Sequence, residues 1–187
     1  SGAEPRPSQP GFRFFAEATE RFRRQTVRQL ANPYPAAGGL PTPTGGVLNA
    51  RSSYARSLAD GKSRLRRLVT SRLRACPKSK LFLTGHGQGA HVTGDVYHAL
   101  AGAPPSGFGR IVGVALFGDP RFNSADRKAA RGTPRFRVGR NGFLGPRKPF
   151  PASTRGRVRS FCHRPDYVCQ ATSLYDRFGL GPHRTYH

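Results

Sequence analysis

A glycine-rich segment in the middle of the chain has the residue types and spacing of a catalytic turn. An apolar run, Leu81 to Thr84, leads into Gly85-His86-Gly87-Gln88-Gly89 and then into a helix-forming sequence. This order is typical of a nucleophile elbow, G-x-S-x-G, in which small flanking residues let a sharp strand-to-helix turn pack closely and a serine attacks an acyl carbon. Position 87, where the serine would stand, is glycine. On its own, the pattern fits a packing turn or a phosphate-binding turn as well as an elbow.

The flanking sequence predicts alternating strands and helices that would position this turn. Apolar residues at helical spacing predict helices over residues 12–25, 51–75 and 88–101, and short apolar runs predict strands over residues 26–30, 80–84, 110–117 and 157–161. The run at 110–117 is continuously apolar, which is typical of a parallel strand buried on both faces. The sequence therefore predicts one α/β domain over residues 1–187, with a mostly parallel central sheet flanked by helices in three layers.

The composition fits a folded domain with a strongly basic surface. The 187 residues include 32 Lys and Arg against 9 Asp and Glu, which gives a formal net charge of +23. This charge predicts an anionic partner, although charge runs are usually only solvated faces. The stretch at 127–164 is the most basic and contains no acid. Nucleic acid is disfavoured as the partner because no zinc-ligand spacing, aromatic RNA-binding motif or recognition-helix pattern accompanies the charge.

Across nearly its full length, the chain resembles the cutinase family, especially the cutinase-like esterases of actinobacteria. Five motifs carry the resemblance. The first two are a Tyr-Pro turn at Tyr34-Pro35-Ala36 and a cysteine eleven residues before position 87, in Cys76-Pro77. The others are an apolar run ending in Gly-Asp-Pro at 114–120, a short loop between two cysteines at 162–169, and a histidine followed three residues later by tyrosine at 183–186. The resemblance implies a cutinase-like α/β-hydrolase fold, in which elbow, acid and histidine follow in this order along the chain.

The resemblance also implies the roles of the site residues. It places the nucleophile position at Gly87, the triad acid at Asp166 and the general base at His183. The oxyanion donors would be the backbone N–H of Gln88 and the residue Ser1. Without a hydroxyl at position 87 no acyl-enzyme can form, so the chain as written is predicted to be inactive. It is either a natural pseudoenzyme or a form whose serine was replaced, and the intact acid and base favour replacement.

Other titratable residues have simpler interpretations. Asp176 is a rival for the acid, seven residues before His183, but it lies outside the cysteine loop. His86 is a candidate to line the site, whereas His91 and His98 are expected to be helix residues that face neighbours. Structural roles, capping or pairing with arginines, are expected for Asp95 and Asp119. Because no second histidine or carboxylate stands at ligand spacing from these histidines, neither a metal nor a cofactor is predicted.

The cysteines bear on both topology and compartment. Cys162 and Cys169 can close a small loop, which leaves Cys76 without a partner. By the resemblance, the partner of Cys76 would lie upstream of a first strand that is missing here, and Ser1 would follow that strand. A second chain or an N-terminal segment would then supply the strand and the cysteine; in the alternative interpretation, Cys76 is a buried free thiol. Disulfide use indicates an oxidising compartment, and with no bilayer-spanning run and no leader peptide the chain is expected to be a mature or partial form of a secreted protein.

Two functional hypotheses follow from these observations. The first is a secreted carboxylic ester hydrolase, of the cutinase, lipase or phospholipase kind, that acts on lipid or polyester substrates and is held here in a form without its nucleophile. Its basic surface would favour an anionic membrane or cell envelope. The alternative is a non-catalytic pseudoenzyme or toxin-cargo module that uses the same scaffold and its arginines to bind a partner protein or the envelope. A serine codon at position 87 of the encoding gene would favour the ester hydrolase over the non-catalytic module.

Overall fold

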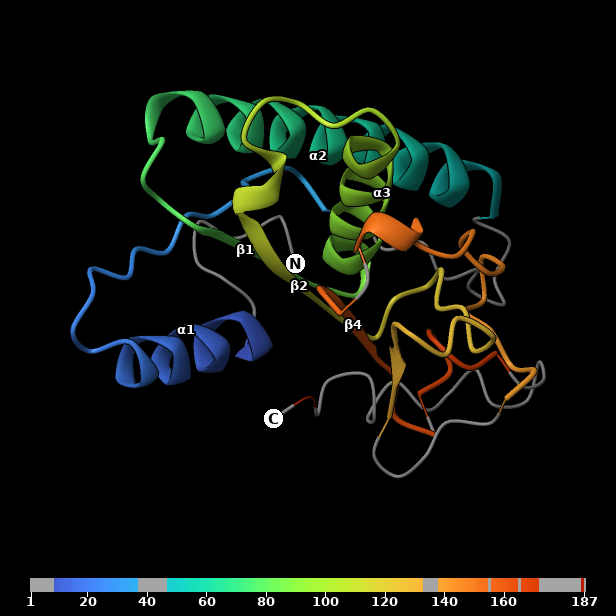
Figure 1. Cartoon of the computed structure of the whole chain (residues 1–187). Coiled ribbons are helices and arrows are strands. Elements are labelled where there is room, and N and C mark those ends of the chain that lie inside the picture. Colours follow the sequence, from blue (N-terminus) through green and yellow to red (C-terminus); the bar gives the residue numbers. More distant parts are fainter. Residues whose placement is uncertain are drawn as a thin grey trace.

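A parallel sheet lies at the centre of the computed structural model, which describes residues 9–36, 47–132, 138–154, 156–164, 166–171 and 186. Its four described strands are in the order β1-β2-β4-β3, and every described pair is parallel. The strands are β1 (Leu81–His86), β2 (Ile111–Phe117), β3 (Ala130–Arg131) and β4 (Val158–Phe161). Helices α2 (Val47–Ala75) and α3 (Gln88–Gly102) cover one face, and α1 (Gln9–Arg21) lies on the other (Figure 1). The predicted three-layer α/β architecture with a central parallel sheet is confirmed.

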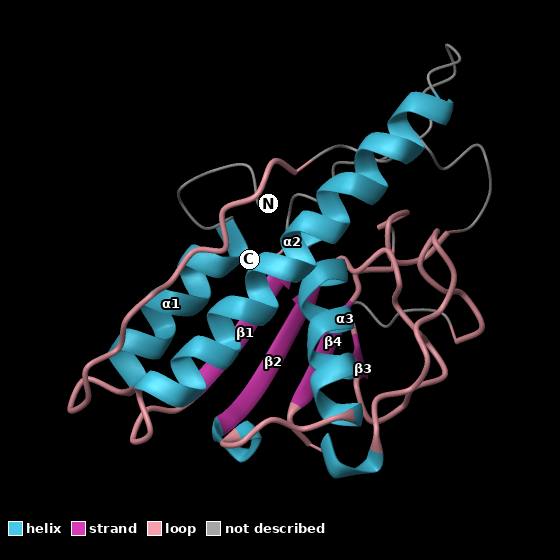
Figure 2. Cartoon of the chain, turned by 90° about the horizontal axis from the view of Figure 1, so that it is seen from above, coloured by secondary structure: helices cyan, strands magenta, loops and turns pink. Residues whose placement is uncertain are grey.

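The core lies between the sheet and the layer formed by α2 and α3. Figure 2 looks down on this layer, with α2 and α3 lying over the strands. Along α2, apolar residues at helical spacing turn inward while the arginines between them stay exposed. The core includes Leu65, Val69 and Leu73 of α2, Val92, Val96 and Leu100 of α3, and Leu83, Val114 and Leu116 of the strands. On the opposite face α1 packs against the edge strand β1, where Phe14 stacks on Phe82 with ring centroids 4.4 Å apart.

The predicted helices and strands agree with the structure in kind, with one exception. Residues 26–30, predicted as a strand, run through loop without pairing to another strand. A β-type sequence forms a strand only where a neighbour offers its backbone groups, and no described strand lies beside this segment. In the other direction, β3 lies outside every predicted strand, and the short 3-10 helices Phe108–Arg110 and Ala152–Thr154 were not predicted either. Among the described residues β1 is an edge strand, so the predicted additional strand and the partner of Cys76 stay predictions; Cys76 itself is a free thiol.

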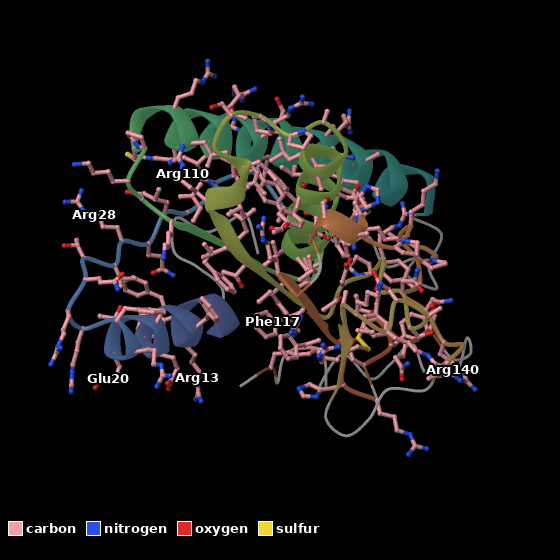
Figure 3. All side chains as sticks on the ribbon, viewed as in Figure 1. Arg13, Glu20, Arg28, Arg110, Phe117 and Arg140 are labelled. Carbon is pink, nitrogen blue, oxygen red and sulfur yellow. A yellow bond between two sulfur atoms is a disulfide. The ribbon has the colours of Figure 1, made fainter. Side chains whose placement is uncertain are left out.

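Most of the arginines point into solvent. In Figure 3, Arg13, Arg28 and Arg140 lie at the periphery, whereas Phe117 lies among the side chains at the centre. Arg110 differs, because its guanidinium turns back and donates to the carbonyl oxygens of Leu73 and Cys76 at the end of α2. These are carbonyls that a helix cannot satisfy internally, so Arg110 caps α2. Within the described ranges, no helix combines the length and the apolar character needed to cross a membrane.

Candidate active site

The predicted elbow is a sharp turn between β1 and α3. Gly87 is the residue between the two elements, and its φ of 56° and ψ of −121° lie in the left-handed half of backbone space. Its N–H donates to the carbonyl of Phe117 at the end of β2 (2.9 Å), and its own carbonyl accepts the N–H of His91 in α3 (3.1 Å). An L-residue adopts such a φ only at a cost, so glycine relaxes this turn and a serine here would be strained.

The two glycines that flank the turn are not equivalent. A Cβ on Gly85 would lie 2.3 Å from the carbonyl oxygen of Gly89, which is far inside van der Waals contact. A Cβ on Gly89 would meet no atom within 4 Å. The expectation that a small residue is needed for close packing is therefore confirmed for Gly85 and wrong for Gly89, because a Cβ on Gly85 would point at the backbone of Gly89, whereas a Cβ on Gly89 would point into open space.

Gln88 opens α3 and carries the predicted oxyanion donor. Its backbone N–H belongs to the first turn of a helix, where N–H groups have no partner within the helix and the helix dipole favours negative charge. Its side chain is held from α2, since Oγ of Ser57 lies 3.1 Å from Oε1 of Gln88 and 2.6 Å from the carbonyl oxygen of Pro35. Ser57 thus connects the Tyr-Pro turn, α2 and the elbow, which fixes the direction in which α3 begins.

The predicted acid, Asp166, is completely buried in the loop after β4. The predicted disulfide between Cys162 and Cys169 closes this loop, with Cα atoms 5.8 Å apart. Oδ1 of Asp166 accepts the backbone N–H of Val168 (2.8 Å), and Oδ2 accepts the hydroxyl of Tyr186 (2.6 Å). A buried carboxylate is tolerated only with such donors, so the loop is built around this side chain.

Tyr186 connects the acid loop to the carboxyl ends of the strands. Its ring stacks on His163 (centroids 4.3 Å apart) and meets the rings of His86 and Phe117 edge-on (5.7 and 6.0 Å). His86 and Phe117 are the last residues of β1 and β2, and His86 precedes the elbow glycine. Because the carboxyl ends of parallel strands meet at one edge, His86 and Tyr186, one hundred positions apart, are brought together here.

The site predicted from the sequence is therefore only partly described. Gly87, Gln88 and Asp166 lie at the same edge of the sheet, whereas Ser1, His183 and the rival acid Asp176 lie outside the described residues. Their roles stay predictions. His86, a candidate to line the site, packs on Tyr186. Sequence reasoning used Tyr186 only as part of a motif with His183, and its spacing gave no sign of a bond to the acid.

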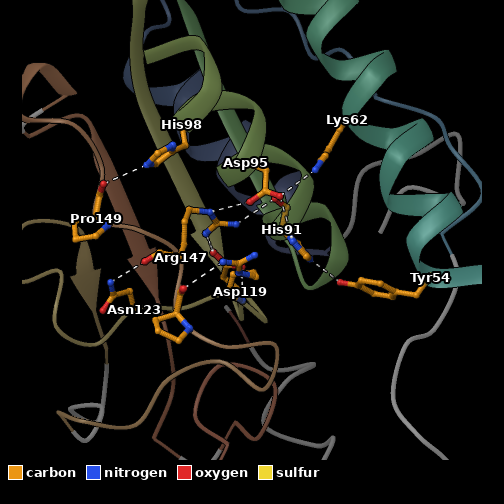
Figure 4. A network of polar contacts seen from close by, with 11 residues as sticks. Tyr54, Lys62, His91, Asp95, His98, Asp119, Asn123, Arg147 and Pro149 are labelled. Carbon is orange, nitrogen blue, oxygen red and sulfur yellow. Dashed lines mark hydrogen bonds and ion pairs between the residues drawn. The ribbon is translucent and has the colours of Figure 1, made fainter. Parts of the chain in front are cut away.

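A second buried polar cluster lies behind the elbow, around Arg147 (Figure 4). The guanidinium of Arg147, which is 5% exposed, pairs with the fully buried Asp119 after β2 and with Asp95 of α3 (3.1 Å), and it donates to the carbonyl of His91 (3.2 Å). Asp95 also binds Lys62 of α2 and Nε2 of His91, each at 3.3 Å. The expectation that Asp95 and Asp119 pair with arginines is confirmed.

The charges in this cluster stabilise one another. Burial opposes ionisation of Asp95, but the hydrogen bond from His91 and the charge of Arg147 outweigh it and hold the pKa of Asp95 well below its usual range. Burial likewise disfavours a charged Arg147, yet Asp119 and Asp95 raise its pKa above the ordinary value. His91 completes the cluster. With its proton on Nε2 it donates to Asp95, and its Nδ1 accepts the hydroxyl hydrogen of Tyr54 (3.0 Å).

Arg147 was missed by the sequence analysis because nothing in its neighbourhood distinguishes it from the exposed arginines of the basic stretch at 127–164. The one local signal is on its partner helix. A Cβ on Gly94 would lie 2.6 Å from the guanidinium carbon of Arg147, so the glycine makes room for the buried cation. Within the parts of the chain that the structure describes, no group of three or more His, Cys, Asp or Glu side chains is placed to hold a metal ion.

The arrangement defines a class of protein. A parallel sheet between helical layers, a positive-φ turn from a strand into a helix, and a buried carboxylate in a loop after a later strand are the features of the α/β-hydrolase fold. The family description that matches is Cutinase, over residues 1–187. The chain belongs to the cutinase family.

Individual relatives agree with this assignment. A cutinase of Monilinia fructicola is 27% identical over 126 residues, which are 67% of this chain and 47% of that protein. Acetylxylan esterase 2 of Talaromyces purpureogenus is 27% identical over 158 residues, covering 79% of this chain and 64% of that protein. The catalytic core domain of the acetyl xylan esterase from Trichoderma reesei superposes with a TM-score of 0.65 at 19% identity, over 92% of this chain and 82% of that one. The chain spans about half the length of the Monilinia cutinase.

Proposed function

We propose that this chain is a secreted carboxylic ester hydrolase of the cutinase type, which works through a Ser-Asp-His triad and is inactive in the present sequence because Gly87 stands at the nucleophile position. The observation that carries the proposal is the position of the buried Asp166, which Tyr186 joins to His86, the residue next to a positive-φ elbow. Membership of the cutinase family and relatives with esterase names support it.

Each group has a defined task in the proposed reaction. A serine at position 87 attacks the ester carbonyl while His183 takes its proton, and His183 later protonates the departing alcohol. Asp166 orients His183 and stabilises its cationic form. The backbone N–H of Gln88 stabilises the oxyanion, with Ser1 as the proposed second donor. Water then releases the acid from the acyl-enzyme by the same proton transfers in reverse order.

The test compares ester hydrolysis by the chain as it stands with hydrolysis by Gly87→Ser, on p-nitrophenyl esters of short and medium acyl length. The serine variant should gain at least about a thousandfold in kcat/KM, because a missing triad member costs several orders of magnitude. Changing His183 to Gln in that variant should abolish the gain. A folded Gly87→Ser chain that cleaves none of these esters would refute the proposal.

The substrate is proposed to be a lipid or polyester ester, as the name cutinase given to several relatives suggests. The alternative is an acetylated polysaccharide, because another relative is named acetylxylan esterase. Gly87→Ser should cleave tributyrin or polycaprolactone faster than acetylated xylan. Faster cleavage of acetylated xylan would indicate that polysaccharide acetyl esters are the substrate class. The disulfide at Cys162 and Cys169 supports an extracytoplasmic site of action.

The exposed face of α2 is rich in arginine, which supports the proposal that the protein acts at an anionic surface. Its arginines turned to solvent are Arg56, Arg64, Arg66, Arg67, Arg72 and Arg74, and of these Arg64 is paired with Asp60 (2.8 Å). Cations in such a row attract anionic headgroups through a field that salt screens. Binding to liposomes that contain phosphatidylglycerol should exceed binding to phosphatidylcholine liposomes and should fall as salt rises. Equal binding that salt does not change would contradict this part of the proposal.

A further inference from the structure

We infer that Tyr186 is a positioning residue for the proposed hydrolysis, which acts through Asp166 by donating its hydroxyl hydrogen to Oδ2 of that carboxylate. The inference rests on the proposed function and deepens it, since neither the family assignment nor the triad pattern gives this tyrosine a role. Both side chains are among the described residues, and the bond between them is short, at 2.6 Å.

Burial and neighbouring groups make Tyr186 a one-way donor to the acid. The residue is 4% exposed, and its hydroxyl oxygen accepts the backbone N–H of His163 (3.1 Å), so its own hydrogen is directed to Asp166. Burial and the negative charge of Asp166 raise the pKa of Tyr186, which keeps the phenol protonated across the pH range of ester hydrolysis. A hydrogen bond from a neutral donor to a buried carboxylate is among the stronger ones in proteins.

The ring of Tyr186 is fixed independently of its hydroxyl. His163 stacks on one face at 4.3 Å, and the rings of His86 and Phe117 meet it edge-on from the ends of β1 and β2. Among the described residues, the titratable groups that face Tyr186 include His86 from β1, His163 from the segment after β4, and Asp166 from the disulfide loop. Because aromatic contacts hold the ring, replacement by phenylalanine removes the bond to Asp166, together with the acceptor of the His163 N–H, and leaves the packing in place.

The hydroxyl of Tyr186 controls how strongly Asp166 acts on its partner base. A donor on Oδ2 stabilises the carboxylate charge and fixes the plane of the carboxyl group, and the backbone N–H of Val168 on Oδ1 does the same from the other side. Loss of the tyrosine donor lets the carboxylate rotate and concentrates its charge toward the imidazolium of the base. The base is then less well oriented and more basic, which lowers kcat and raises the pKa of the histidine.

The experiment uses Gly87→Ser as the active background and compares Tyr186→Phe with Tyr167→Phe. Tyr167 belongs to the same disulfide loop, but its ring stacks on Phe143 (6.3 Å) rather than on the strand ends, which makes it a matched control. Tyr186→Phe should lower kcat about tenfold with little change in KM, and it should move the acidic limb of the pH profile of kcat to higher pH. Tyr167→Phe should change neither. Far-UV circular dichroism and thermal melts verify that each variant is folded.

Two further variants make the inference independent of a folding defect. In the Asp166→Asn background, Tyr186→Phe should cost no additional activity, because the group through which Tyr186 acts has lost its charge. With 3-fluorotyrosine at position 186, a stronger donor, the acidic limb should move to lower pH, opposite to Phe. The inference is overturned if Tyr186→Phe leaves kcat and the pH profile unchanged, if it costs as much in Asp166→Asn, or if the fluorinated residue shifts the limb as Phe does.

Failure of the proposed function would be recognised separately. If Gly87→Ser is folded but inactive, the hydrolase proposal falls, and the role of Tyr186 is then measured in the unaltered Gly87 chain by NMR titration of the His183 ring, assigned with a His183→Gln variant. Tyr186→Phe should raise the pKa of His183 there, and Tyr167→Phe should not. An unchanged pKa of His183 in both variants would overturn the inference about Tyr186 whatever the activity.

Discussion

Replacement of Arg147 by methionine should strongly destabilise the fold, whereas replacement of its neighbour Lys148 should not. Methionine matches the length of the arginine stem but leaves the fully buried Asp119 and the partly buried Asp95 without their cation. It also removes the donor to the carbonyl of His91 (3.2 Å). Breaking a buried ion pair from one side costs about 3 to 5 kcal/mol, since a carboxylate is left uncompensated away from water. Lys148 is exposed, so Lys148→Met should cost less than about 1 kcal/mol.

The sign of the pH dependence provides a second check. The depressed pKa of Asp95 gives the natural chain stability that is fully present above the ordinary aspartate pKa, near 4, and is lost as the pH falls through the lower folded-state value. In Arg147→Met the charge that helps to lower the pKa of Asp95 is gone, so this variant loses less stability than the natural chain over the same pH range. The difference in free energy of unfolding should therefore be largest above about pH 4 and should shrink as the pH falls below that value.

The assay is urea denaturation followed by far-UV circular dichroism at several pH values. It needs no enzymatic activity and no assumption about position 87. Equal destabilisation by Arg147→Met and Lys148→Met at neutral pH would refute the argument that the buried network stabilises the fold. A difference that stays constant as the pH falls below about 4 would show that packing, and not charge, accounts for the loss.

Three further outcomes are expected. Gly87→Ser should lower the free energy of unfolding by about 1 to 2 kcal/mol, because the serine must adopt the φ of 56°, and thermal denaturation would measure a stability cost that accompanies the gain in activity. Gly85→Ala should destabilise by about 1 to 3 kcal/mol through the contact with the Gly89 carbonyl, whereas Gly89→Ala should be neutral or stabilising; equal effects in urea would contradict the turn geometry. Cys162→Ala/Cys169→Ala, which opens a seven-residue separation, should cost about 2 kcal/mol at the midpoint of urea unfolding, and no loss would mean that the loop is held without its disulfide.

Prediction from the sequence succeeded where the information is local. The stripe that includes Leu65, Val69 and Leu73 has the helix period, so α2 and its buried face followed directly from spacing. The elbow at Gly87 and the disulfide between Cys162 and Cys169 each lie within a few consecutive residues, and both are present. The strand predicted at 26–30 failed for the opposite reason. A strand requires a neighbour with free backbone groups, and the sequence of the segment itself contains no information about that neighbour.

The sequence by itself determined the class of fold, the family and the place of the turn, because periodicity, turn residues and short motifs depend on neighbours along the chain. Only the tertiary structure decided that Tyr186 donates to Asp166 across twenty positions, and that Arg147, among many exposed arginines, pairs with Asp95 across fifty-two. Burial distinguishes these side chains from chemically identical ones on the surface. Burial depends on how the helices pack on the sheet and how the ends of its strands come together, and not on the neighbouring residues in the sequence.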